Sequence, residues 1–84
     1  MEDFNILLKN IDKVHTTEMG IDRIKKNLGL TDEDAVKYCK DLVLSKDCVI
    51  YKQGKNWYCE IGNAVITINS YSYTIITAHK QRNR

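Results

Sequence analysis

Residues 48–80, CVIYKQGKNWYCEIGNAVITINSYSYTIITAHK, decide the fold. β-Branched and aromatic residues cluster there in four runs with turn residues between them, which predicts four strands. The predicted strands span about 48–53, 56–61, 64–69 and 72–79. The connections Gly54-Lys55 and Gly62-Asn63 fit two-residue type II′ turns, whose twist matches that of the flanking strands. The stretch therefore predicts an antiparallel meander.

Tight turns at both connections would place the apolar residues of the first three strands on one face. This predicted core face holds Cys48, Ile50, Trp57, Cys59, Ile61, Ala64, Ile66 and Ile68. The opposite face is mixed and polar, as expected for a half-exposed antiparallel sheet. It holds Val49, Tyr51, Asn56, Tyr58, Glu60, Val65, Thr67 and Asn69. The register of the last strand stays open, because Ile75 and Ile76 are both apolar.

The first 47 residues predict three amphipathic helices, because apolar residues recur there at helical spacing. The helices span about 3–14, 17–28 and 32–45. Thr31 is predicted to be the N-cap of the third helix, with the acidic run 32–34 in its first turn. The order of elements predicts one α+β domain over residues 1–84. In it, three N-terminal helices pack on one face of a four-stranded antiparallel meander sheet.

Composition excludes several classes of protein. The hydrophobic content of 43% and the charged content of 29% are typical of a soluble domain. The chain begins Met-Glu-Asp without the basic start and apolar run of a secretory signal, and it has no apolar run of membrane-spanning length. We therefore expect a cytoplasmic protein with no membrane partner. We also expect no cofactor, no metal and free thiols at Cys39, Cys48 and Cys59, because no phosphate-binding loop, dinucleotide fingerprint or metal-type cysteine spacing occurs.

One stripe of the second predicted helix differs from its apolar face and consists of Thr16, Gly20, Arg23 and Asn27. Glycine inside a helix costs about 1 kcal/mol relative to alanine, so we expect something to approach closely at Gly20. Two interpretations are open. One is close packing of another helix, and the other is an anion site at the helix N-terminus with Thr16, Thr17 and Arg23 as ligand-binding donors. His15 is either a candidate catalytic base beside that site or a structural residue.

Charge is unevenly distributed along the chain. Residues 1–47 contain 8 Lys and Arg against 10 Asp and Glu, whereas residues 48–84 contain 5 Lys and Arg against one Glu. Basic charge with interleaved aromatic residues is typical of nucleic-acid binding, although core aromatics beside a solvated basic tail give the same pattern. Under the first interpretation, single-stranded nucleic acid binds the outer sheet face and the tail. The ligand-binding candidates on this side are Lys55, Asn56, Tyr58 and Asn69, with tail cations Lys80, Arg82 and Arg84.

Three stretches together resemble a known family. The first begins His15-Thr16-Thr17-Glu18-x-Gly20-x-x-Arg23 and runs to Leu28. The second is Gly54-Lys55-Asn56-Trp57-Tyr58, and the third runs from Ile66 through Tyr71-Ser72-Tyr73-Thr74-Ile75-Ile76-Thr77-Ala78-His79 to Lys80. Over roughly residues 5–80 the chain resembles the bacterial family called domain of unknown function 3781. The resemblance implies a bacterial, cytosolic protein and implies no activity.

The C-terminal half is also similar in layout to metal-independent ribonucleases of the barnase and RelE-like toxin type. That resemblance implies that RNA lies on the sheet face away from the helices. Glu60 and His79 are then the candidate acid/base pair for catalysis. The sequence departs from such enzymes, because Glu60 is the sole acid in the predicted strands and these strands contain no arginine.

The favoured hypothesis is a non-catalytic binding or protein-interaction module. An uncovered sheet edge has to be paired or protected, so a homodimer through such an edge is a candidate assembly. The alternative is single-stranded RNA binding or a ribonuclease-like activity on the outer face. A DNA-binding winged helix is disfavoured, because the acidic run 32–34 would repel phosphate at the start of the reading helix.

Overall fold

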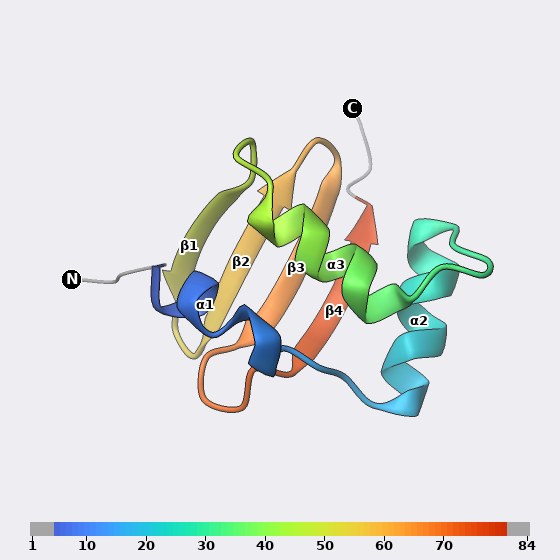
Figure 1. Ribbon diagram of the computed structural model, residues 1–84, viewed down its shortest axis with the longest axis horizontal. Helices are drawn as coiled ribbons and strands as arrows, with labels where there is room; N and C mark the ends of the chain where they lie inside the picture. The colour runs from blue at the N-terminus through green and yellow to red at the C-terminus, as the bar shows by residue number, and fades with distance from the viewer. Residues whose placement is uncertain (1–4, 81–84) are drawn as a thin grey trace.

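The computed structural model describes residues 5–80 and shows a sheet with helices on one side (Figure 1). Its four strands pair antiparallel in the order β1-β2-β3-β4. They are β1 (Val49–Gln53), β2 (Asn56–Ile61), β3 (Ala64–Asn69) and β4 (Ile75–Lys80). The predicted α+β fold, with three helices and a four-stranded antiparallel meander, is confirmed.

Both predicted hairpin turns have the backbone that the sequence requires. Gly54 has φ 64° and Gly62 has φ 58°, whereas Lys55 and Asn63 do not adopt positive φ. This sign pattern is that of a type II′ turn. The resulting register pairs Ile50 with Cys59, Trp57 with Ile68, and Cys59 with Ile66, as the apolar pattern predicts.

The last strand begins later than predicted, at Ile75 rather than at residue 72. Asn69 Oδ1 accepts hydrogen bonds from the backbone N–H of Tyr71 and of Ser72, and Tyr73 adopts φ 60°, so this segment forms a compact turn. A register shift between Thr67 and Ile68 then introduces a bulge opposite them. The bulge settles the open register: Ile75 is buried, and Ile76 is 46% exposed.

The helices are α1 (Asn5–Lys9), α2 (Glu18–Leu28) and α3 (Ala35–Leu44), with a 3₁₀ turn η1 (Ile11–Lys13). The single helix predicted over residues 3–14 is wrong in its middle. Asn10 breaks it, because its side-chain Nδ2 donates to Ile6 O at 2.8 Å and its carbonyl accepts from Lys13 N in a tighter turn. None of the helices within residues 5–80 is long and apolar enough to cross a membrane.

The N-cap of α3 also differs from the prediction. Asp34, not Thr31, caps the helix, and its Oδ1 accepts from Lys37 N at 3.1 Å. Thr31 instead belongs to the preceding loop, where its N–H donates to Glu33 Oε1. Aspartate competes well with threonine for this position, and the later start leaves the acidic residues outside the first helical turn.

The three helices cover the sheet unequally. α1 and α3 lie across its apolar face, whereas α2 lies alongside β4 at the edge of the sheet (Figure 1). The chain entering α2 is fixed to that edge, because His15 N donates to Tyr73 O and Ile75 N donates to His15 O at 2.7 Å. Thr16 Oγ1 adds a bond to Ile75 O at 3.1 Å.

The close approach at Gly20 comes from Thr16. A Cβ placed on Gly20 would collide with the Thr16 hydroxyl, which lies between the glycine and β4. The close neighbour of Gly20 is therefore the side chain of the preceding turn and not a packed helix. Glycine is required at position 20 because it leaves room for Thr16 to reach the edge of β4.

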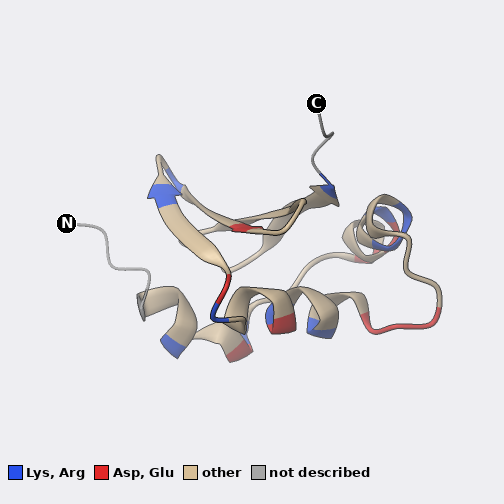
Figure 2. Cartoon of the chain, turned by 90° about the horizontal axis from the view of Figure 1, so that it is seen from above, with Lys and Arg blue, Asp and Glu red and all other residues tan. Residues whose placement is uncertain are grey.

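The sheet face away from the helices is uncovered among the described residues (Figure 2). Val65 and Thr67 of the central strand β3 lie on it and are each only 8% exposed. Side chains of the neighbouring strands shield them, since no helix does. Within the described strands, Glu60 is the acid on this side, since it pairs with Val65.

The cysteines are free and belong to the apolar layer. Burial raises the pKa of the Cys59 thiol to about 12 and that of Cys39 to about 11, and burial also raises the pKa of the half-buried Cys48. Because the thiolate is the reactive form, we expect slow native labelling at pH 8, with Cys48 first. Rate measurements by mass spectrometry with and without guanidinium check this expectation. Fast native labelling of Cys39 or Cys59 would contradict their burial.

Candidate functional site

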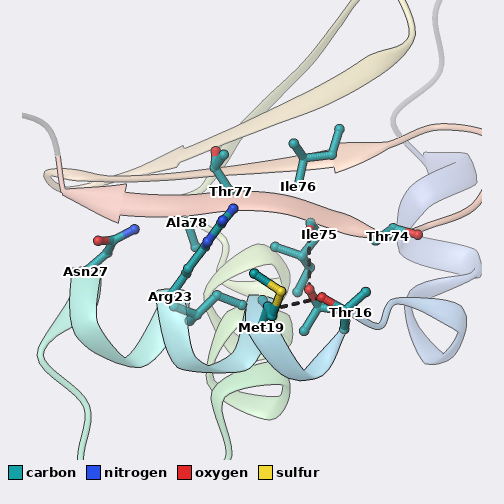
Figure 3. Close-up of a pocket in the computed structure, with 12 residues that line it drawn as sticks. Thr16, Met19, Arg23, Asn27, Thr74, Ile75, Ile76, Thr77 and Ala78 are labelled. Atoms are coloured by element: carbon teal, nitrogen blue, oxygen red, sulfur yellow. Dashed lines mark hydrogen bonds between the residues drawn. The ribbon is translucent and has the colours of Figure 1, made fainter.

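A groove of about 310 Å³ lies between α2 and the edge of β4 (Figure 3). One wall is α2 with the residues just before it, and the other is the segment 74–78. The stripe that stands out in the sequence of α2, from Thr16 through Gly20 and Arg23 to Asn27, faces this groove. The opposite wall has no comparable local signal in the sequence, because pairing of α2 with β4 is a tertiary contact.

The groove has an apolar floor and a partly apolar rim. Ile24, Ile75 and Ala78 are at most 3% exposed and form the floor. Met19 is an exposed large side chain on the α2 wall, and the exposed Ile76 projects from β4 away from α2 (Figure 3). This arrangement favours a ligand that combines an apolar group with a few polar ones.

Arg23 is the charged side chain of the groove. It extends from α2 toward Thr77 and Ala78 of β4 (Figure 3). Within residues 5–80 its guanidinium has no hydrogen-bond or ion-pair partner. A cation with five donors in a planar fork is therefore available to a ligand.

The two threonines predicted as ligand donors already serve the fold. Thr17 is the N-cap of α2, and its Oγ1 accepts from Gly20 N at 3.0 Å. The Thr16 hydroxyl donates to Ile75 O. Glu18 occupies the first turn and complements the helix dipole there. Of the three predicted donors, Arg23 is the one whose hydrogen-bonding capacity is unused among the described residues.

The backbone of β4 offers two further polar groups to the groove. In an antiparallel ladder, alternate residues direct N–H and C=O away from the neighbouring strand. Ile75 directs these groups away from β3, since its N–H donates to His15 O. Ala78, which pairs with Ile66 after the bulge, has the same orientation as Ile75. No described residue outside β3 provides a partner for the Ala78 N–H and C=O.

His15 lies beside the groove in a hydrogen-bonded chain. Its Nδ1 lies 2.9 Å from Lys13 O and donates to it, because a carbonyl oxygen can only accept, and its Nε2 lies 3.2 Å from Thr74 Oγ1. Ser72 Oγ lies 2.7 Å from Thr74 Oγ1 and continues the chain. Through these contacts His15, the candidate base, links the start of α2 to the start of β4.

The candidate acid/base pair lies on the uncovered sheet face, and neither residue lines the groove. Glu60 pairs with Val65, and Val65 pairs with His79, so two strand spacings, about 9.5 Å, separate the backbones of the pair. Glu60 Oε2 accepts from Tyr51 Oη at 2.7 Å, and this hydrogen bond raises the pKa of Tyr51. The Tyr51 ring stacks on Tyr58 at 5.5 Å between ring centroids.

The remaining candidates gather at the end of the sheet near the first hairpin. Lys55 O accepts from Ser70 N at 2.8 Å, which joins this hairpin to the turn after β3. Asn56 pairs with Asn69, whose Oδ1 is used in that turn. Asn56 Oδ1 is shielded and has no partner among the described groups. The tail cations Arg82 and Arg84 lie outside the described residues.

No group of His, Cys, Asp and Glu within residues 5–80 is arranged to hold a metal ion. Comparison with known proteins then identifies the family. The model for "Protein of unknown function (DUF3781)" matches residues 8–79, a range that contains both walls of the groove. Searches of curated proteins and of solved structures found no match. The chain belongs to the DUF3781 family.

Proposed function

We propose that this protein is a non-catalytic binding module whose α2–β4 groove takes a ligand with a negatively charged group. The observation that carries the proposal is the Arg23 guanidinium, which lies in the groove without a partner among residues 5–80. A planar guanidinium recognises carboxylate and phosphate by paired hydrogen bonds. The volume of about 310 Å³ suits a small ligand or the end of a larger one.

The lining of the groove favours binding over catalysis. None of the described lining residues is Asp, Glu, His, Cys or Lys. General acid/base chemistry and most covalent catalysis need one of these side chains within hydrogen-bond reach. The threonine hydroxyls at its end are committed to β4 and to the helix cap.

The test is an NMR titration with acetate and inorganic phosphate as simple anions. We expect the amide signals of Arg23, Thr77 and Ala78 to shift, and we expect Arg23→Ala to weaken the binding of the preferred anion at least tenfold, because a hydrogen bond to a charged group contributes about 1.5–3 kcal/mol. Lys26→Ala is the matched control, since Lys26 is exposed on the same helix and does not line the groove. Equal effects of the two variants, or no shifts in the groove, would contradict the proposal.

A second candidate function is binding of single-stranded nucleic acid on the uncovered sheet face. The stacked pair of Tyr51 and Tyr58 favours it, because aromatic rings on an open sheet are platforms for bases. Lys55 and Lys80 would meet phosphates at the ends of the strands. Glu60 and His79 share this face, so metal-independent RNA cleavage belongs to the same candidate, and His79→Ala should then abolish cleavage while binding persists.

Tyr58→Ala should weaken oligonucleotide binding with little loss of stability, because stacking contributes about 1–3 kcal/mol per base. Tyr38→Ala is the control, since Tyr38 lies on α3 in the other layer. Fluorescence anisotropy with a labelled oligonucleotide at low and high salt measures the effect, and affinity should fall steeply with salt. Absence of binding at low salt would remove this candidate.

Self-association and cellular location are further parts of the proposal. A homodimer through a sheet edge would use β1, because α2 lies beside the edge of β4 (Figure 1). Light scattering would then give twice the chain mass of 9.8 kDa. A bacterial, cytoplasmic protein is what the family resemblance implies.

A further inference from the structure

We infer that the ligand of the α2–β4 groove is an N-acyl amino acid, a free carboxylate next to a secondary amide, either as the last residue of a peptide or as a free small molecule. The inference rests on the proposed function and names its ligand chemistry. It stands on three features of the groove: the unpaired backbone N–H and C=O of Ala78, the unpartnered Arg23, and the closure of the strand edge at Ile75.

The first feature is a pair of backbone groups that lack partners. Ala78 directs its N–H and C=O away from β3, toward α2, and no described residue of α2 bonds them. Ala78 is only 1% exposed, so water is largely kept from these groups as well. Buried backbone groups without partners are rare and costly in folded proteins. Arg23 is exposed and unpaired, so its side chain can move to admit a ligand to them.

One amino-acid residue satisfies both groups at once. In an antiparallel hydrogen-bonded pair, two opposite residues exchange both N–H···O=C bonds. A ligand residue opposite Ala78 would donate its amide N–H to Ala78 O and accept from Ala78 N–H. When that residue is C-terminal, its acceptor is a carboxylate oxygen, and the second carboxylate oxygen is left for Arg23. The guanidinium extends toward this part of β4 (Figure 3).

The strand edge is closed on one side of Ala78. The N–H of Ile75 donates to His15 O, and the C=O of Ile75 accepts from Thr16, so a peptide cannot continue in that direction. An antiparallel peptide must therefore end opposite Ala78 and leave toward Lys80. A parallel peptide would instead begin there and place its ammonium group beside Arg23, which is repulsive. Charge and closure together select a carboxyl terminus.

The side chain of the ligand should be apolar and of leucine size. The ligand side chain would lie on the same side of β4 as Ala78, where the exposed Met19 and the buried Ile24 of α2 line the groove. Peptide recognition at a strand edge generally combines main-chain bonds with a pocket for a side chain. N-acetyl-leucine is therefore a suitable minimal probe.

The experiment compares N-acetyl-leucine with two analogues by NMR titration of the full chain. 4-Methylpentanoate keeps the carboxylate and the branched side chain but lacks the amide, and N-acetyl-leucinamide lacks the carboxylate. We expect N-acetyl-leucine to bind at least tenfold more tightly than either analogue, with a downfield shift and slower hydrogen exchange of the Ala78 N–H. Arg23→Ala should remove the preference for N-acetyl-leucine over N-acetyl-leucinamide, whereas Lys26→Ala should keep it.

The outcomes separate this inference from the proposed function. Equal affinity for N-acetyl-leucine and 4-methylpentanoate would overturn amide recognition and leave anion binding at Arg23 intact. No binding of any carboxylate would overturn the inference, and no binding of inorganic phosphate either would overturn the proposed function as well. A peptide ending in leucine, added as a further arm, distinguishes the sources: tighter binding than N-acetyl-leucine identifies a peptide C-terminus, and equal binding identifies the free small molecule.

Discussion

Replacing Trp57 by alanine is expected to come close to unfolding the protein. Trp57 is 3% exposed, lies opposite Ile68 on the apolar face, and its ring packs against Tyr73 with 5.6 Å between centroids. Removing a large buried ring costs roughly 3–5 kcal/mol through lost burial and the cavity left behind. At about 0.05–0.15 kcal/mol per residue, a domain of 84 residues has a total of roughly 4–13 kcal/mol.

Chemical denaturation followed by far-UV circular dichroism measures this effect, because the substitution removes the chain's one tryptophan fluorophore. Trp57→Phe is the control. It keeps most of the apolar contact and removes the indole Nε1, which is buried and has no partner among the described groups. We therefore expect a much smaller loss for phenylalanine than for alanine. A small loss for both variants would place Trp57 at the surface and contradict the register.

The two central strands show what the sequence predicts well. β2 (Asn56–Ile61) and β3 (Ala64–Asn69) begin and end at the predicted residues. A two-residue turn with glycine at its first position fixes the register, and a shift by one residue would turn the apolar side chains outward. Local turn chemistry and the apolar pattern therefore agree, and each is visible in the sequence.

The differences arise where side chains compete for backbone groups. Asn69 organises the turn before β4, Asn10 interrupts the first helix, and Asp34 takes the N-cap from Thr31. Each uses a short polar side chain that several positions in the sequence could supply. The bulge near Ile76 leaves no periodic signal, because it inserts one residue into an otherwise regular strand.

One of the two walls of the candidate site could be predicted from the sequence. The stripe from Thr16 to Asn27 predicts one wall, since helical spacing places these residues on one face. The opposite wall depends on which strand is the edge beside α2 and on which of its residues point outward. Those facts follow from pairing between segments more than 50 residues apart, as the bond between Thr16 and Ile75 illustrates with a separation of 59.

Gly20→Ala is expected to destabilise the protein by about 2 kcal/mol, although alanine is the better helix former by about 1 kcal/mol. The added Cβ would collide with the Thr16 hydroxyl, which bonds Ile75 O and fixes α2 to β4. Overpacking of this kind costs about 1–3 kcal/mol, and the displaced hydroxyl also loses its bond. For a domain of this size, thermal unfolding should shift downward by roughly 10 °C.

A double-mutant cycle with Thr16→Ala assigns the cause. Without the Thr16 hydroxyl there is less to collide with, so Gly20→Ala should cost at least 1 kcal/mol less in that background than in the native chain. Asp22→Ala, at an exposed position of α2, should leave stability nearly unchanged and controls for helix propensity. Additive effects of Gly20→Ala and Thr16→Ala, or a gain in stability from Gly20→Ala alone, would show that the Thr16 contact does not hold α2 against the strand edge. The groove would then owe its shape to the apolar contacts of Ile24 and Ala78 instead.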